Sequence, residues 1–75
     1  MELIERITIE PGKRSGRPCV RGIRITVSDV LQLLSEGLTT EQVLEQMPDL
    51  EPDDVNACLS YAARYMDHPR LVASA

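Results

Sequence analysis

The spacing of apolar residues changes along the chain, from a period of two near the N-terminus to between three and four from residue 26 onward. Residues 3–9 end in the alternation Ile7-Thr8-Ile9, and a second alternation runs over residues 23–27. Alternation with β-branched residues is typical of strands with one buried face. The apolar pair Cys19-Val20 adds a further short strand. We predict an irregular β-ribbon over residues 1–26, called the head below, which must pack on helices or pair with another chain because short ribbons are marginal alone.

The first predicted helix begins at Val27. Four apolar residues lie at positions i, i+3, i+4 and i+7 of one helix face: Val27, Val30, Leu31 and Leu34. Thr26 and Ser28 are alternative N-caps for this helix, and Asp29 places a negative charge in its first turn. Gly37 ends the helix, because glycine adopts the left-handed conformation without penalty.

Two further helices follow. Thr39 and Gln42 have the spacing of a capping box, which predicts a short second helix that ends before Pro48. Pro52 suits the first position of a third helix, because its missing N–H would be unpaired there. The apolar residues of this third helix are Val55, Cys58, Leu59, Ala62 and Met66.

Together these patterns predict a mainly α fold in a single domain. The head is followed by a three-helix bundle over residues 27–67, with the outline of a helix-turn-helix unit, and by a mobile tail over residues 68–75. We expect six residues in the core: Leu31, Leu34, Leu44, Val55, Leu59 and Ala62.

The composition indicates a thin aliphatic core. The 75 residues include neither Trp nor Phe and only Tyr61 and Tyr65 as aromatic residues. A chain this short gains buried surface by self-association, so we expect a homodimer. Cys19 and Cys58 lie far apart in segments of different kinds, which favours buried reduced thiols and a cytoplasmic location. No apolar run approaches the roughly 18 residues of a membrane span, so we expect no membrane association.

The charges are unevenly distributed. Residues 1–27 carry six basic and three acidic side chains, whereas residues 28–75 carry two basic and nine acidic ones. The basic side chains gather in residues 13–24, called the basic loop below, which contain no acidic residue: Lys13, Arg14, Arg17, Arg21 and Arg24. Two interpretations stay open. Either the basic loop meets an external anion or acidic partner, or it offsets the acidic helices within the fold.

The sequence offers no convincing catalytic or metal-binding set. His68 is the single histidine, and together with Cys19 and Cys58 it shows none of the paired spacings of zinc sites. Asp53 and Asp54 belong to an acidic cluster at the start of the third helix, where carboxylates stabilise the helix dipole. On a helix they point about 100° apart and do not converge on one bond. We therefore predict a protein that is not an enzyme and has no metal, cofactor or small-molecule substrate.

A helix-turn-helix outline raises DNA binding, and the charges decide which segment would serve. The last helix of such units usually presents its N-terminal residues to the bases. Here those residues include Asp53 and Asp54, which would repel phosphates. If DNA is bound, we expect the contacts to come from four arginines of the basic loop: Arg14, Arg17, Arg21 and Arg24.

Three blocks of the sequence, taken in order, resemble one small bacterial family. The blocks are residues 16–27, 33–39 and 47–55, and the family is the domain of unknown function numbered four hundred and thirty-three, with a homeodomain-like helical part. The resemblance covers roughly residues 7 to 66. Gly22 and Arg24 match the family's Gly-Thr-Arg signature, with Ile23 where threonine is usual. Glu51 replaces the usual Thr or Ser N-cap before Pro52.

The resemblance implies an antitoxin, because some members look like the smaller partner of a pair whose toxin is a PIN-like ribonuclease. Two modes of inhibition are open. An arginine of the basic loop could pair with the carboxylates that hold metal in such a nuclease. Alternatively, the acidic helices, with Asp53 and Asp54, could cover a basic RNA-entry surface. The competing hypothesis is a pure protein-interaction and dimerisation module that binds no nucleic acid.

Overall fold

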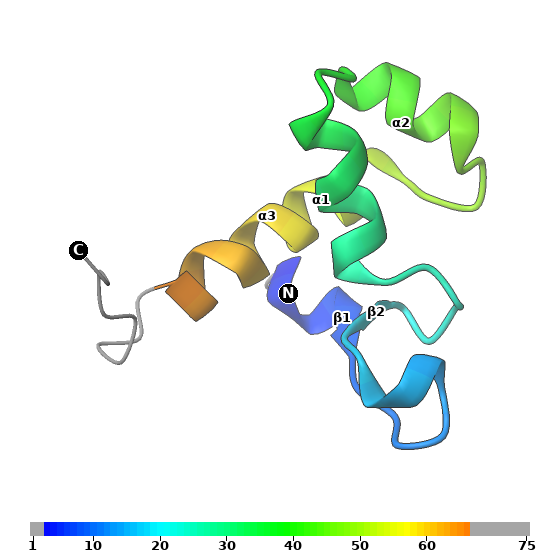
Figure 1. Ribbon diagram of the computed structural model, residues 1–75, viewed down its shortest axis with the longest axis vertical. Helices are drawn as coiled ribbons and strands as arrows, with labels where there is room; N and C mark the ends of the chain where they lie inside the picture. The colour runs from blue at the N-terminus through cyan, green and yellow to red at the C-terminus, as the bar shows by residue number, and fades with distance from the viewer. Residues whose placement is uncertain (1–2, 67–75) are drawn as a thin grey trace.

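The fold is mainly α, with three helices and a two-stranded antiparallel sheet in residues 3–66, which are the residues that the computed structural model describes (Figure 1). Its elements in chain order are the 3-10 helix η1 (Leu3–Arg6), strand β1 (Ile7–Thr8), the 3-10 helix η2 (Arg14–Gly16), strand β2 (Cys19–Val20) and helices α1 (Val27–Ser35), α2 (Thr40–Gln46) and α3 (Pro52–Met66). This arrangement confirms the predicted class of a short β-ribbon followed by three helices. The predicted mobile tail, residues 68–75, lies outside the described residues.

The β-ribbon is shorter than the alternating pattern predicted. Strand β1 pairs with β2 so that Ile7 lies opposite Val20. Residues 3–6 form a helical turn that packs along α3 instead of extending β1. Residues 23–27 form no full strand, but they do lie beside β2: Thr26 bridges Cys19, and the Val20 N–H donates to the Ile25 carbonyl oxygen at 3.0 Å. A tight turn precedes this segment, in which Arg21 and Gly22 both have positive φ, 45° and 73°, as in a type I′ hairpin turn.

The predicted helix caps are confirmed. The Thr26 hydroxyl accepts the Asp29 N–H at 3.0 Å, and the Asp29 carboxylate accepts the Thr26 N–H at 3.0 Å, so Thr26 and not Ser28 caps α1. Thr39 and Gln42 form the same reciprocal pair at the start of α2. Gly37, with a φ of +97°, turns the chain out of α1.

The core is built mainly from valines of all three helices and of β2. Its buried members are Val20, Val27, Val30, Val43, Leu50, Val55 and Cys58. Of the predicted core residues, Val55 is buried, while Leu31, Leu34 and Leu44 are partly buried and pack against this cluster.

The placement of Leu59 in the core was wrong, because its exposed fraction is 46%. The buried residues of α3 are Asp54, Val55, Ala57 and Cys58. The sequence pattern had treated Asp54 as a surface residue. Consecutive residues on a helix lie about 100° apart. The buried face of α3, which contains Asp54, is therefore centred on a direction away from Leu59.

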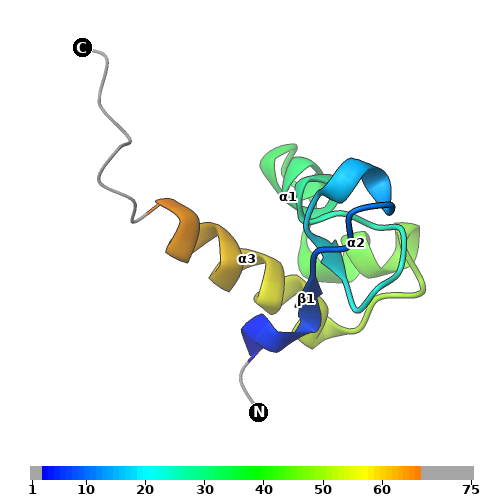
Figure 2. The same cartoon turned by 90° about the horizontal axis from the view of Figure 1, so that it is seen from below.

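The C-terminal half of α3 projects from the rest of the protein. Figure 1 and Figure 2 show it extending away from α1, α2 and the sheet, with η1 lying beside it. Tyr65 and Met66, in its last turn, are 63% and 65% exposed. None of the described helices is long and apolar enough to cross a membrane.

Candidate functional site

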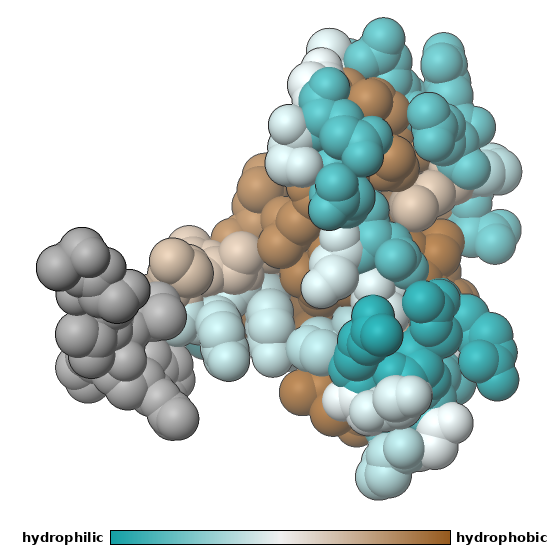
Figure 3. Space-filling view, viewed as in Figure 1, coloured by the Kyte–Doolittle hydropathy of each residue, from teal (hydrophilic) through white to brown (hydrophobic). Residues whose placement is uncertain are grey.

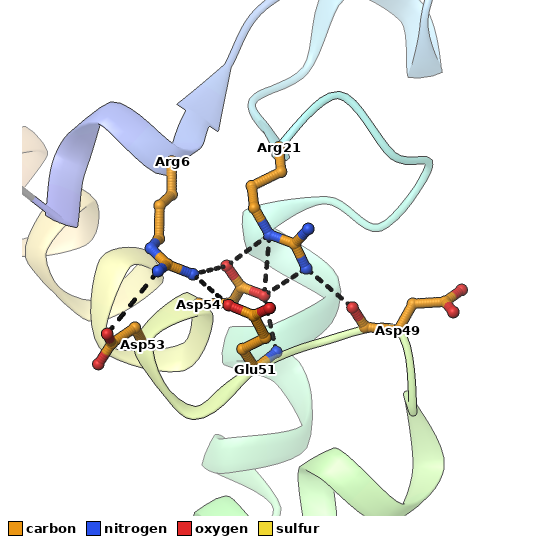
Figure 4. A network of polar contacts seen from close by, with 6 residues as sticks. All are labelled: Arg6, Arg21, Asp49, Glu51, Asp53 and Asp54. Carbon is orange, nitrogen blue, oxygen red and sulfur yellow. Dashed lines mark hydrogen bonds and ion pairs between the residues drawn. The ribbon is translucent and has the colours of Figure 1, made fainter.

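A buried carboxylate held by two arginines joins the head to α3 (Figure 4). The side chain of Asp54 is completely buried. Arg21 donates to both of its oxygens, from Nε at 3.0 Å and from Nη2 at 2.8 Å. Arg6 donates from Nη1 at 2.9 Å. We call Arg6, Arg21 and Asp54 the Asp54 cluster. Its bidentate geometry is the strong form of an arginine–carboxylate pair.

The Asp54 cluster also closes the N-terminus of α3. The Glu51 N–H donates to Asp54 Oδ2 at 2.7 Å, and Arg21 Nη2 donates to the Asp49 carbonyl oxygen at 2.9 Å. Arg6 Nη1 additionally donates to the Glu51 carboxylate at 2.9 Å. Glu51 is the N-cap residue of α3 and Asp54 is the third residue of the helix. The Asp54 carboxylate accepts the N–H of the N-cap residue, which is one of the two hydrogen bonds of a capping box. One carboxylate fixes both the start of α3 and its attachment to the head.

The charge of Asp54 is maintained by its partners. Burial alone would raise the pKa of Asp54, but hydrogen bonds from Arg21, the Glu51 N–H and Arg6 outweigh it and hold the pKa at about 2, below the ordinary 3.8. The carboxylate is therefore ionised at neutral pH and remains paired with Arg21, whose own pKa is raised by its hydrogen bonds to Asp54.

The two cysteines are buried free thiols. Burial, together with the neighbouring charge of Asp54, raises the pKa of Cys58 to about 12. A thiol with so high a pKa is a poor nucleophile at neutral pH. Among residues 3–66, no group of three or more His, Cys, Asp or Glu side chains is placed to hold a metal ion.

Three of the five cations in the basic loop are engaged within the fold. Besides Arg21, Arg14 donates to the Arg24 carbonyl oxygen at 2.6 Å and lies 3.6 Å from the Asp29 carboxylate. Lys13 donates to the carbonyl oxygen of Gly22. These contacts stabilise the loop conformation, in which Arg14 and Ser15 have positive φ.

Arg17 and Arg24 are the outward-facing cations of the basic loop. Both residues are exposed, and neither guanidinium forms an ion pair with another residue of the described range. The structure thus divides the four predicted arginines into two that hold the fold together, Arg14 and Arg21, and two that face solvent.

The two predicted aspartates lie in different environments. The Asp53 side chain is 59% exposed and its Oδ2 lies 3.7 Å from Arg6 Nη2. The Asp54 carboxylate is withdrawn into the Asp54 cluster. Of the two, only Asp53 lies where a partner protein could reach it.

An apolar groove of about 440 Å³ lies between the head, α1 and α3. Ile9 and Pro18 line it from the head, Val27 and Leu31 from α1, and Tyr61 and Tyr65 from α3. Within the part of the chain that the structure describes, no charged side chain lines it. Figure 3 shows the apolar surface running along α3 and beside α1, between the hydrophilic surfaces of α2 and of the basic loop.

The sequence did not point to Arg6 or to this groove. Arg6 pairs with Asp54 across 48 positions, and no local pattern marks such a distant partner. The groove had a partial signal in the i, i+4 pair of Tyr61 and Tyr65, whose rings stack with centroids 6.5 Å apart.

Comparison with known proteins identifies a family but no activity. The model of a family described as "Protein of unknown function (DUF433)" matches residues 7–62, which include Arg21, Asp54 and the whole basic loop. The "Uncharacterized protein y4eO" of Sinorhizobium fredii (strain NBRC 101917 / NGR234) is 34% identical over 58 residues, which are 77% of this chain and 26% of that protein. The chain thus spans about a quarter of that relative's length. No solved structure matches the chain. On the family match, the chain belongs to the DUF433 family of proteins of unknown function.

Proposed function

We propose that the protein is a non-enzymatic regulator of the antitoxin kind, which binds a PIN-like ribonuclease through Arg17 and Arg24. The observation that carries the proposal is the exposure of these two arginines on a head that is fixed to α3 by the buried Asp54 cluster. The nuclease partner itself comes from the resemblance to the family.

The chemistry of the two surfaces supports this choice. A PIN-like active site gathers carboxylates around a divalent metal, and a guanidinium forms two parallel hydrogen bonds with a carboxylate. Because the Asp54 cluster fixes the head before binding, less conformational entropy is lost when the arginines engage the partner. The same field of positive charge would speed the encounter with an acidic site. We place this activity in the cytoplasm, where buried free thiols stay reduced.

A second candidate role is binding of operator DNA by the same arginines. In this proposal α1 and α2, joined by the short turn at Gly37, give the helix-turn-helix outline. The exposed side chain of Asp53 at the start of α3 disfavours that last helix as the reader of the bases. Phosphate contacts would then come from Arg17 and Arg24, with the head lying along the DNA backbone.

The nuclease role is tested by purifying the chain with the product of the neighbouring reading frame and measuring inhibition of its ribonuclease activity. We expect the Arg17→Ala/Arg24→Ala variant to bind at least about 100-fold more weakly than the wild type, as when two charged contacts are lost. Arg64→Ala on α3 removes a positive charge elsewhere and serves as the control, with less than about a threefold effect. Equal inhibition by the double variant and the wild type would remove the head from toxin binding.

The DNA role is tested by retention of the DNA upstream of the gene at about 50 and 200 mM salt. If the arginines contact phosphates, the double variant lowers the salt slope by about two relative to the wild type. Absence of any retention at the lower salt concentration would leave a protein-interaction module without nucleic-acid binding.

A further inference from the structure

The apolar face of α3 continues beyond the part of the helix that the core covers. Val55, Cys58, Ala62 and Tyr65 follow the alternating spacing of three and four residues that forms the contact seam of paired helices. Val55 and Cys58 are completely buried in the core, whereas Tyr65 is 63% exposed. One face of α3 is therefore packed at its N-terminal half and open at its C-terminal half.

The surface around this open half combines a hollow with a projection. The apolar groove lies on one side of the Tyr61–Tyr65 pair, and a smaller hollow lined by Ile4 and Arg64 lies on the other. The last turn of α3, with Met66, forms the projecting part. Ile9, another exposed large apolar residue, stands on the opposite wall of the groove at 59% exposure.

We propose that a second copy of the chain covers this surface, with the two α3 helices antiparallel across a two-fold axis. Such an axis requires a patch that is complementary to itself, because the same residues meet from both subunits. Here the end of α3 from each copy would lie in the groove of the other, with Met66 of one copy against Ile9 of its partner. The inference does not depend on the proposed antitoxin role.

Charge also favours a second copy as the occupant. Among residues 3–66, no charged side chain lines the groove, so two copies would meet there without like-charge repulsion from these residues. Pro18 lines the groove, and the residue before it in the sequence, Arg17, is exposed. In the antiparallel arrangement, the partial negative charge at the C-terminus of the partner's α3 would complement the positive charge of this arginine.

The test is sedimentation equilibrium of the full chain between about 10 µM and 1 mM, since an interface of this limited size gives a weak dimer. We expect the wild type to approach twice the monomer mass at the upper concentrations. Met66→Glu and Ile9→Lys should each raise the dissociation constant at least tenfold. The matched control is Asn56→Glu, a charge placed on the exposed side of α3 away from the groove, and it should dimerise as the wild type does. Ile9 and Met66 are both exposed, so the thermal midpoints of their two variants should stay close to that of the wild type.

Mixing the two variants tests the antiparallel placement. A chain with Ile9→Lys and a chain with Met66→Glu should form a heterodimer more tightly than either forms a homodimer, because the new charges meet across the interface. A wild type that stays monomeric at 1 mM overturns the proposal, and so do variants that dimerise as well as the wild type. Equal association in the mixture and in the separate variants overturns the antiparallel arrangement. A wild type that is monomeric but loses a foreign partner on Met66→Glu assigns the groove to that partner instead.

Discussion

At the scale of single residues, Asp54 has the largest structural effect. A buried carboxylate costs much hydration energy unless charged partners and hydrogen bonds replace the lost water. Asp54 receives donors from Arg21, Arg6 and the Glu51 backbone, and no described buried side-chain polar atom lacks a partner. The residue is therefore tolerated in the core only as part of the complete Asp54 cluster.

Replacing this carboxylate should destabilise the fold far more than replacing its neighbour. Asp54→Asn keeps the size of the side chain but removes its charge, and we expect a loss of about 3 kcal/mol in the free energy of unfolding. Asp53→Asn, at an exposed position of the same helix turn, should change it by less than about 0.5 kcal/mol. Urea unfolding of both variants measures the difference. Equal losses would show that the Asp54 cluster contributes little stability.

At the scale of the elements, the sequence predicted those features that depend on contacts between residues close in sequence. The caps at Thr26 and Thr39 involve partners three residues away, and the end of α1 depends on one glycine, so each was visible locally. The head was predicted less well. Its alternating pattern suggested longer strands, but residues 3–6 form a helical turn that packs on α3 instead.

The candidate site was predictable only in part, because its contacts are distant in sequence. Arg21 pairs with Asp54 across 33 positions and Arg6 across 48, so the basic loop could be seen but not divided into engaged and free cations. The burial of Asp54 also explains why the pattern of α3 placed Leu59 in the core. A search for apolar spacing counts only apolar residues, so it does not detect a charged residue at a buried position.

Two truncations in α3 compare the observed and the sequence-based orientations of this helix. Val55→Ala removes methyl groups from a completely buried side chain and should lower the free energy of unfolding by about 2 kcal/mol. Leu59→Ala, at 46% exposure, should cost about 1 kcal/mol or less although it deletes a larger group. Chemical denaturation of the two variants ranks them. A greater loss for Leu59→Ala would mean that α3 is rotated from the orientation described.

At the scale of the whole molecule, the fold separates three kinds of surface. The exposed arginines lie on the head, acidic side chains follow the outer face of α2, and the apolar groove with the open half of α3 lies between them (Figure 3). A dimer through α3 would present Arg17 and Arg24 twice in one assembly. Two weak contacts to a two-fold symmetric target would then reinforce each other.

Stability in acid should reflect the pKa of Asp54. Its folded-state pKa is about 2 and its ordinary value 3.8, so between these values the unfolded chain binds more protons and stability rises with pH. The contribution is fully present above about pH 4 and is lost as the pH falls toward 2; it amounts to about 2 kcal/mol. Urea unfolding at a series of pH values checks this, with Asp54→Asn as the control that lacks this part of the slope. Parallel curves for the two proteins would contradict the assignment.

The pairing of Arg6 with Asp54 across 48 residues also orders the events of biosynthesis. A ribosome delivers the head first, yet its anchoring carboxylate arrives only with the start of α3. The nascent head therefore lacks a stable docking site until Asp54 has been added, and closing so long a loop slows folding. Chains that terminate early, before residue 54, should leave an unfolded basic segment that cellular proteases remove.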